Sequence, residues 1–284
     1  MAPFLIGVIY LLAAKPLFAA DNHSEKSISP RIISLAPHLT EMIYSAGAGD
    51  HLVGVVNYSD YPPQAEKLPV IGDYNSLNLE ALIQLKPDII LSWKSGNRLQ
   101  DIERLKSLGF RVVENEIHKL EDIPSTILAI GKLAGTDETA IKTADELQAL
   151  LQEIRQQNQR KANVSTFYQI WNNPLITMGK EQFISQGLAL CNAENIFNDL
   201  PSLSAQISLE AVLQRDPQLI LLGGDKAFQK DWQTAWMRYP TITAVKNRHI
   251  FRVNNDLYQR PTERFIRALP DLCNLVNKTR DSSN

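Results

Sequence analysis

The sequence predicts an α/β protein made of two Rossmann-like lobes joined by a single long α-helix, with a ligand cleft between the lobes. Two observations predict this fold class: short apolar runs alternate with helical patterns in each half, and one strand–helix pattern recurs in both halves. A third is an uninterrupted helical stretch that separates the halves. The length of 284 residues is typical of about two domains.

The N-terminal lobe is expected over residues 31–135. Apolar runs predict four strands, at 32–35, 52–56, 88–93 and 111–113, and helical patterns lie between and after them at 39–47, 79–85, 99–108 and 121–134. Strands that alternate with helices in this way favour a parallel sheet, whose ligands lie beyond the carboxyl ends of the strands.

The linker helix is expected over residues 136–162, which contain no Gly or Pro. Apolar residues recur there at intervals of three and four, among them Ala140, Ala144, Leu147, Leu151 and Ile154. Such spacing predicts one amphipathic helix of about 24 residues, roughly 36 Å long.

The C-terminal lobe is expected over residues 163–278 and begins with a strand at 164–170. The segment LNLEALIQLKPDIILSW (77–93) recurs as QISLEAVLQRDPQLILLGG (206–224), shifted by 130 positions. This is an internal repeat of one unit: polar cap, short helix, turn and buried strand. Asn78 and Ser208 are the expected N-caps, so that Glu80 and Glu210 fall in the first helical turns.

Residues 1–20 are typical of a secretory signal peptide, with an apolar run at 4–14 that is too short to span a bilayer and cleavage expected after Ala19 or Ala20. The alternative is an N-terminal strand or anchor helix. No cysteine follows the apolar run, which favours a freely soluble periplasmic protein over a lipid-tethered one. Cys191 and Cys273 are an even pair, and either form one disulfide in an oxidising compartment or remain two buried thiols.

Motifs of catalysis and phosphate binding are absent from the sequence: there is no G-x-S-x-G, no P-loop and no G-x-G-x-x-G. The five histidines show no H-x-x-x-H pairing, so no metal site is predicted. His38 follows Ala36-Pro37 and is either a metal ligand or an ordinary residue at a helix start. A pI near 6.2 and a net charge of −2 argue against nucleic-acid binding. The protein is therefore not expected to be an enzyme.

Aromatic residues gather where strands end. The set is Tyr58, Tyr61, Tyr74, Trp93, Trp171 and Tyr258. Any one of them could be a core residue. Together they offer flat apolar area with few polar requirements, which suits a large, planar ligand with an amide fringe better than a sugar or an amino acid.

Several segments carry a family resemblance: RIISLAP and TE within 31–41, GVVNYSDYPPQA at 54–65, GNR at 96–98, CNAENIF at 191–197 and DLYQR at 256–260. With the repeat, they make nearly the whole mature chain similar to the cobalamin-binding members of the class III, helix-linked substrate-binding proteins of ABC importers. The YSDYPPQA stretch is the most specific of them, because strand–helix patterns such as LKPDIIL also occur in siderophore, haem and metal binders.

The resemblance implies a ligand held between the lobes by aromatic side chains and a few hydrogen bonds. Tyr58 matches a binding tyrosine, Tyr74 and Trp93 match tryptophan positions, and the second-lobe contact loop corresponds to Asp256, Leu257, Tyr258, Gln259 and Arg260. Cys191 and Cys273 match the family disulfide. Glu80 and Glu210 match glutamates that dock onto arginines of the permease, although each could be an ordinary carboxylate at a helix start.

Two departures concern the second lobe. A polar run, Ser202–Gln206, replaces an expected tryptophan, and Ile176 replaces an expected aromatic residue. Trp171 is an additional aromatic residue that could compensate. These changes bear on which corrinoid is bound and not on the fold.

The predicted function is thus that of a monomeric periplasmic protein that captures cobalamin or a related corrinoid and delivers it to an ABC importer, without a cofactor of its own. A haem or ferric-siderophore binder of the same fold is the first alternative, with Arg260 and Arg264 as its basic residues. The second is an exported metalloenzyme or hydrolase that uses His38 and Glu41.

Overall fold

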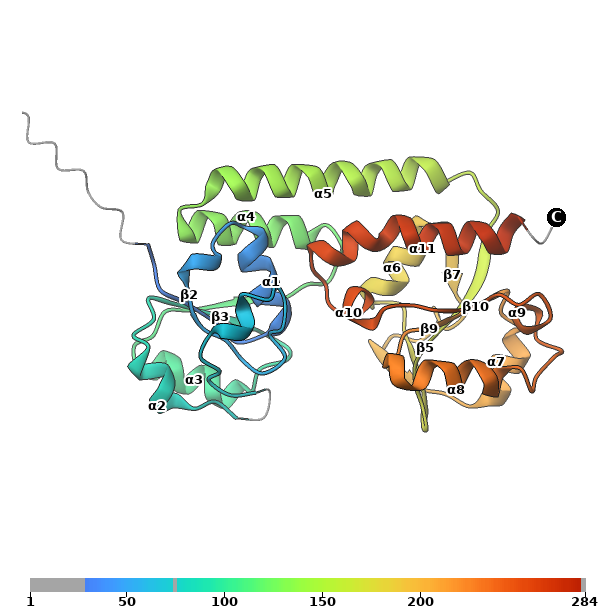
Figure 1. Cartoon of the computed structure of the whole chain (residues 1–284), viewed down its shortest axis with the longest axis horizontal. Coiled ribbons are helices and arrows are strands. Elements are labelled where there is room, and N and C mark those ends of the chain that lie inside the picture. The colour runs from blue at the N-terminus through green and yellow to red at the C-terminus, as the bar shows by residue number, and fades with distance from the viewer. Residues whose placement is uncertain (1–28, 74–75, 282–284) are drawn as a thin grey trace, which may run out of the picture.

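The computed structural model describes residues 29–73 and 76–281, which form two α/β lobes side by side beneath a layer of helices (Figure 1). The fold class expected from the sequence is confirmed. The proposed signal peptide (1–20) and Tyr74 lie outside the described residues.

The first lobe is built on a parallel sheet in the order β2-β1-β3-β4. Its strands are β1 (Ile32–Ser34), β2 (Leu52–Gly54), β3 (Ile89–Trp93) and β4 (Val112–Asn115). Its helices are α1 (Pro37–Ser45), α2 (Leu79–Gln84) and α3 (Leu99–Ser107), with 3₁₀ turns at Gly49–His51 and Ala65–Lys67. All four strands therefore send their carboxyl ends to one edge of the sheet, the edge that faces the second lobe.

The helix α4 (Asp122–Ala134) covers the first lobe, and the long α5 (Asp137–Asn158) folds back over it at Gly135 and reaches across to the second lobe. Gly135 adopts φ 74°, the left-handed conformation that favours glycine at a helix end. The buried face of α5 is the one that the sequence spacing predicts: Ala140, Ala144, Leu147, Leu151 and Ile154.

The second lobe has a mixed sheet in the order β10-β9-β5-β6-β8, with β7 paired to the start of β5. Its strands are β5 (Val164–Asn172), β6 (Leu175–Met178), β7 (Ala193–Asn195), β8 (Ser204–Gln206), β9 (Leu219–Leu222) and β10 (Ile250–Arg252). Its helices are α6 (Phe183–Leu190), α7 (Leu209–Arg215), α8 (Lys226–Trp236), α9 (Thr243–Lys246), α10 (Asn255–Tyr258) and α11 (Glu263–Asp281). Unlike the first sheet, it carries antiparallel strands, because β5 turns directly into β6.

The repeated segments adopt the same local structure. Asn78 and Ser208 each accept a hydrogen bond from the backbone N–H three residues on, at 3.0 and 3.2 Å, and so cap α2 and α7 as the sequence predicts. Each short helix then leads into a central strand, β3 or β9.

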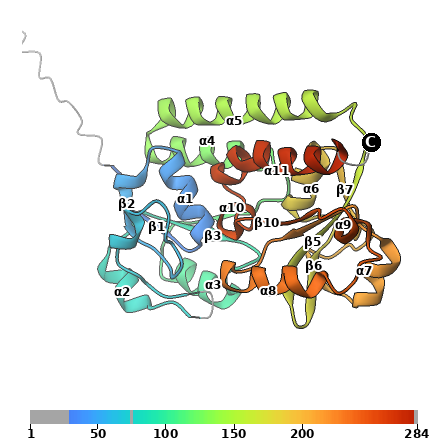
Figure 2. The same cartoon turned by 45° about the vertical axis from the view of Figure 1, so that its right-hand side comes forward.

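One apolar core runs through both lobes. It joins Leu39 and Ile123 of the first lobe, Leu147 of α5, and Leu188 and Leu272 of the second lobe. Figure 2 shows α4, α5 and α11 forming the layer that covers this core on one side of the molecule. The opposite faces of the two sheets have separate cores, under α2 and α3 in the first lobe and under α7 and α8 in the second.

A disulfide between Cys191 and Cys273 joins the end of α6 to the middle of α11. Both residues are buried, and 82 positions of sequence separate them. The disulfide thus fixes the C-terminal helix to the second lobe.

Candidate ligand site between the lobes

The carboxyl edge of the first sheet presents a row of side chains toward the second lobe. In the spatial order of the strands, the chain that leaves β2 contains Tyr58, the chain that leaves β1 contains His38, β3 ends at Trp93, and Glu116 follows β4. The topology therefore places residues that lie far apart in the sequence along one edge.

Trp93 lies in the middle of this row and is held on several sides. Its indole N–H donates to Glu116 (3.1 Å), and the Asn97 side chain links the Trp93 N–H (2.7 Å) to the Leu35 carbonyl (2.9 Å). Its ring lies so close to Gly96 that a Cβ there would come within 1.8 Å of it. The GNR segment noted in the sequence thus fixes an exposed indole at the end of β3.

His38 is buried behind Trp93, with ring centroids 5.1 Å apart in an edge-on arrangement. Its Nε2 has no hydrogen-bond partner in the part of the chain that the structure describes. Burial lowers the pKa of His38 to about 4; the negative charge of Glu116 opposes this shift and the positive charge of Arg260 adds to it. His38 is therefore a neutral core residue at pH 7.

The turn after β2 holds Tyr58 outward, with 72% of its surface exposed. Its backbone has φ 66°, which is uncommon for a large side chain and often marks a functional site. The neighbouring Ser59 hydroxyl accepts a hydrogen bond from Thr40 of α1 (3.1 Å), which fixes the turn to the body of the lobe.

The second-lobe loop expected to contact a ligand splits into supporting and exposed residues. Tyr258 is buried and donates to the Ala268 carbonyl (2.9 Å), and Leu257 is half-buried against the shared core. Gln259 donates to the Gly223 carbonyl at the end of β9. Asp256 is exposed, and Arg260 reaches across to the first lobe.

Arg260 and Arg264 meet two carboxylates of the first lobe. Glu41 of α1 accepts hydrogen bonds from Arg260 (3.0 Å) and from two nitrogens of Arg264 (2.6 and 2.9 Å), and Asp60 accepts from Arg260 at 2.6 and 3.3 Å. Partial burial acts to raise the pKa of Asp60, but the hydrogen bonds and charge of Arg260 outweigh it and hold that pKa below its usual range. Glu41 is thus engaged by guanidinium groups, which leaves it poorly placed for the metal or hydrolytic chemistry considered from the sequence.

Trp171 lies at the end of β5, next to the turn into β6, and is 43% exposed. Its indole N–H donates to the Asn173 carbonyl (3.0 Å), and its ring packs edge-on against Phe228 and Trp232 of α8. Trp171, the additional tryptophan of the second lobe, is therefore held in one orientation and leaves part of its aromatic ring exposed.

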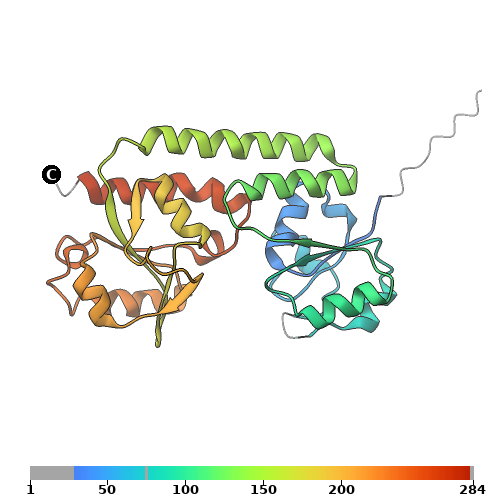
Figure 3. The same cartoon turned by 180° about the vertical axis from the view of Figure 1, so that it is seen from behind.

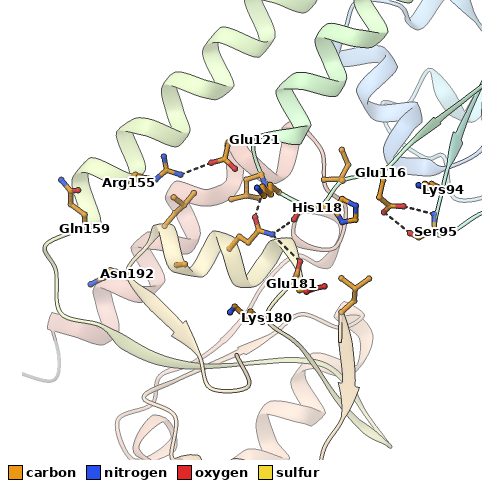
Figure 4. A pocket seen from close by; sticks show the side chains of 17 residues that line it. Lys94, Ser95, Glu116, His118, Glu121, Arg155, Gln159, Lys180, Glu181 and Asn192 are labelled. Carbon is orange, nitrogen blue, oxygen red and sulfur yellow. Dashed lines mark hydrogen bonds and ion pairs between the residues drawn. The ribbon is translucent and has the colours of Figure 1, made fainter. Parts of the chain in front are cut away.

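A cavity of about 1210 Å³ opens between the lobes at the β4 end of the row (Figure 4). Its walls come from both lobes and from α5, and include Lys94, Glu116, Arg155, Lys180, Gln186 and Leu203. Gln186 of α6 bridges the lobes here: its side chain donates to the His118 carbonyl (2.6 Å) and accepts from the Leu120 N–H (3.2 Å). Seen from behind, the segment that leads from β4 to α4 curves between the lobes at this point (Figure 3).

The described site residues expected from the sequence do not line this cavity. Trp93 borders it through Glu116, whereas Arg260 lies toward the opposite end of the row, at the side of Asp60. Sequence reasoning missed Asp60 and Glu116 as parts of the site, and it treated Arg264 only as a basic residue of a rival ligand site. The available signal was the spacing of Arg260 and Arg264, which lie four residues apart at the start of the C-terminal helix α11. Cations that are largely buried at such a place require acidic partners.

Glu80 and Glu210 are in the first turns of α2 and α7, one on each lobe. The pKa of Glu210 lies below its usual range because its carboxylate accepts hydrogen bonds from its own backbone N–H and from Ser208. The repeat therefore places a carboxylate at the same point of each repeated unit, in the first turn of α2 and of α7.

Within residues 29–73 and 76–281, no group of three or more His, Cys, Asp or Glu side chains is arranged to hold a metal ion. None of the helices in these ranges is both long and apolar enough to cross a membrane.

Comparison with curated proteins finds relatives along almost the whole chain. The vitamin B12-binding protein of Vibrio cholerae is 35% identical over 267 residues, which is 94% of this chain and 96% of that protein. The vitamin B12-binding protein of Pectobacterium carotovorum is 36% identical over 260 residues, 91% of this chain and 92% of that protein.

Solved structures show the same fold. The periplasmic vitamin B12-binding protein of Vibrio cholerae matches with a TM-score of 0.80 at 34% identity, covering 88% of this chain and 97% of that one. A periplasmic haem-binding protein of the same species matches with a TM-score of 0.76 at 19% identity, which shows the fold alone. The profile of the periplasmic binding protein family matches residues 32–257. The chain belongs to this family of periplasmic binding proteins.

Proposed function

We propose that this protein captures cobalamin or a related corrinoid in the periplasm and delivers it to an ABC importer. The observation that carries the proposal is the space between the lobes, a cavity of about 1210 Å³ beside an exposed indole. Pockets for drug-sized ligands are roughly 300–1,000 Å³, so this one suits a larger molecule. The relatives at 34–36% identity, whose names state vitamin B12 binding, support the same ligand.

The proposed contact residues do not line the cavity itself; they are proposed from their exposure and from their places at strand ends and in the second-lobe loop. Tyr58, Trp93 and Trp171 offer flat apolar surfaces, and Asp256 and Arg260 offer polar groups for the amides at the ligand rim. Leu257, Tyr258 and Gln259 hold the second-lobe loop in place. Tyr74 is proposed as a further contact on the family resemblance alone.

The remaining proposals concern location and partners. Residues 1–20 would direct export and be removed after Ala19 or Ala20, leaving a soluble, monomeric protein. Glu80 and Glu210 would then dock onto cationic side chains of the permease. Exposed ion pairs are worth only about 0–1 kcal/mol each, so the two carboxylates would orient the complex more than hold it.

The test is a calorimetric titration of the mature protein with cyanocobalamin. We expect tight one-to-one binding that Tyr58→Ala weakens by about tenfold or more, because the variant removes an exposed aromatic face. Leu99→Ala, which truncates an apolar side chain of similar exposure (70%) on α3, is the matched control and should bind as the parent does. If the parent does not bind, cobalamin is rejected, and cobinamide, haem and ferric siderophores are titrated in turn.

Docking is tested separately with Glu80→Ala combined with Glu210→Ala. This pair should leave cyanocobalamin binding unchanged and weaken association with the importer in nanodiscs. Glu138→Ala, which removes an exposed carboxylate from the start of α5, is the control. Loss of ligand binding in the double variant would contradict the assignment of these glutamates to docking.

A further inference from the structure

Four charged side chains join the lobes at the β2 and β1 side of the cleft. Arg260 and Arg264 come from the second lobe, and Glu41 and Asp60 come from the first, so the group is neutral as a whole. Because the partners are about 200 positions apart in sequence, every bond between them ties one lobe to the other.

The two carboxylates differ in burial. The Glu41 side chain is only 2% exposed and accepts bonds from both arginines, whereas that of Asp60 is 53% exposed and bonds to Arg260. Removing a buried charged partner is strongly destabilising, so the Glu41 contacts are durable. The exposed Asp60 contact is screened by solvent and salt and is easily exchanged.

Arg264 is fixed on a second side. Its guanidinium carbon lies 3.7 Å from the centre of the Tyr61 ring, in a cation–π contact that also braces the turn that carries Asp60. Arg264 therefore anchors Glu41, and Glu41 in turn holds Arg260.

Arg260 has donors on both sides of its fork. Nη1 is shared between Glu41 and Asp60, and Nη2 donates to Asp60 at the longer distance of 3.3 Å. A planar guanidinium presents the same fork to a carboxylate or to amide oxygens. A ligand oxygen that accepts from both nitrogens of this fork takes the place of Asp60, because the Glu41 side is buried.

We propose that Glu41 is a positioning residue that holds Arg260 at the cleft, and that Asp60 is an internal competitor that occupies Arg260 until an oxygen of the ligand replaces it. The ligand class, a molecule fringed with amide oxygens, rests on the proposed function. The arrangement keeps Arg260 neutralised and oriented in the empty protein.

The competitor role is tested by titrating Asp60→Asn with cyanocobalamin. Affinity should rise by up to about fivefold, the scale of one exposed ion pair. Asp199→Asn, which removes an exposed carboxylate paired with Arg215, makes the same charge change elsewhere and should have no effect. In an Arg260→Gln background the gain should vanish. Weaker binding by Asp60→Asn, or a gain that persists without Arg260, would overturn the proposal.

The positioning role of Glu41 is tested by the effect of Asp60→Asn on cyanocobalamin affinity. If Glu41 were only structural, replacing it would not change the sign of that effect. In Glu41→Gln, Asp60 becomes the carboxylate that orients Arg260, so adding Asp60→Asn should now lower affinity, the reverse of its effect in the parent. An unchanged sign would refute the role. If Glu41→Gln does not fold, Glu41→Asp, which retracts the carboxylate, is used for the same comparison.

A ligand-free measurement separates failure of this proposal from failure of the proposed function. Both native cysteines are in the disulfide, so spin labels at Arg104→Cys of α3 and Lys230→Cys of α8 report the distance between the lobes. Asp60→Asn should broaden that distance distribution, and Asp199→Asn should not. If the parent binds no cobalamin but the broadening occurs, the ligand is wrong and the contact stands. An unchanged distribution overturns the proposal.

Discussion

At the scale of single residues, the edge of the first sheet combines exposed aromatic groups with a buried neutral histidine. Trp93 is held in place by Asn97 and Glu116. His38 is packed behind it, and no residue that the structure describes offers a hydrogen-bond partner to its Nε2. A buried group whose pKa differs between the folded and unfolded states makes stability depend on pH. His38 is such a group.

The first prediction concerns acid stability. The pKa of His38 falls from 6.5 to about 4 on folding, so below pH 6.5 the unfolded chain binds a proton that the folded protein does not. His38 should therefore cost about 2 kcal/mol of stability by pH 5 relative to pH 7.5. Urea unfolding at the two pH values should show this loss in the parent and lack it in His38→Gln. His118→Gln, which removes an exposed histidine, is the control, and an equal loss in His38→Gln would contradict the assignment.

Some residues of the site could be predicted from the sequence, and others could not. Tyr58 and Trp93 could be singled out because a turn and a strand end are local features of the sequence. Whether Tyr258 faces a ligand or the core depends on the packing of α10 against α11, and the structure places it in the core. The spacing of Arg260 and Arg264 indicates only that acidic partners are needed. Because the cluster joins two lobes, no local pattern identifies Glu41 and Asp60 as those partners.

At the scale of elements, the strands of the first lobe and the apolar face of α5 follow the periodicity of the sequence closely. Hydrophobic spacing decides such elements because each has one buried face. The antiparallel β6 and β8 were not predicted, since they are four and three residues long and β8 is largely exposed. The close contact of α4 with α5 depends on Gly131, which lies against Ala140. The local sequence could not predict this role, because it depends on how the two helices pack.

The second prediction tests that contact. A Cβ built on Gly131 of α4 would lie 2.2 Å from the Cβ of Ala140 on α5, so the helices would have to separate. Gly131→Ala should therefore destabilise the protein by about 1–3 kcal/mol, although alanine favours the helix itself by about 1 kcal/mol. Urea unfolding measures the change. Gly131→Ala combined with Ala140→Gly removes the clash and should recover most of the loss; a Gly131→Ala variant as stable as the parent would disprove the close packing.

At the scale of the whole molecule, one apolar core crosses both lobes beneath α4, α5 and α11, and polar bridges join the lobes at two further places. The bridges are the Glu41 cluster at one end of the cleft and Gln186 at the other. The sequence predicted two lobes with a cleft, and it left open how far they behave as separate bodies.

The third prediction follows from the shared core. Because residues such as Leu39, Leu147 and Leu272 belong to one cluster, neither lobe can unfold without exposing apolar surface of the other. Scanning calorimetry should give one transition, with equal calorimetric and van't Hoff enthalpies. The isolated N-terminal lobe, residues 29–135, is the comparison and should not melt cooperatively. Two resolved transitions in the full protein would show that the lobes are thermodynamically independent.

The continuous core has a consequence for the proposed delivery of ligand to an importer. If the lobes cannot move far apart, the span between Glu80 and Glu210 is nearly the same in empty and loaded molecules. If Glu80 and Glu210 dock onto a permease as proposed, the permease would meet both forms with similar docking faces, and empty carriers would occupy it alongside full ones. Uptake would follow the fraction of carriers that are loaded, so that making more of this protein without more vitamin would slow delivery.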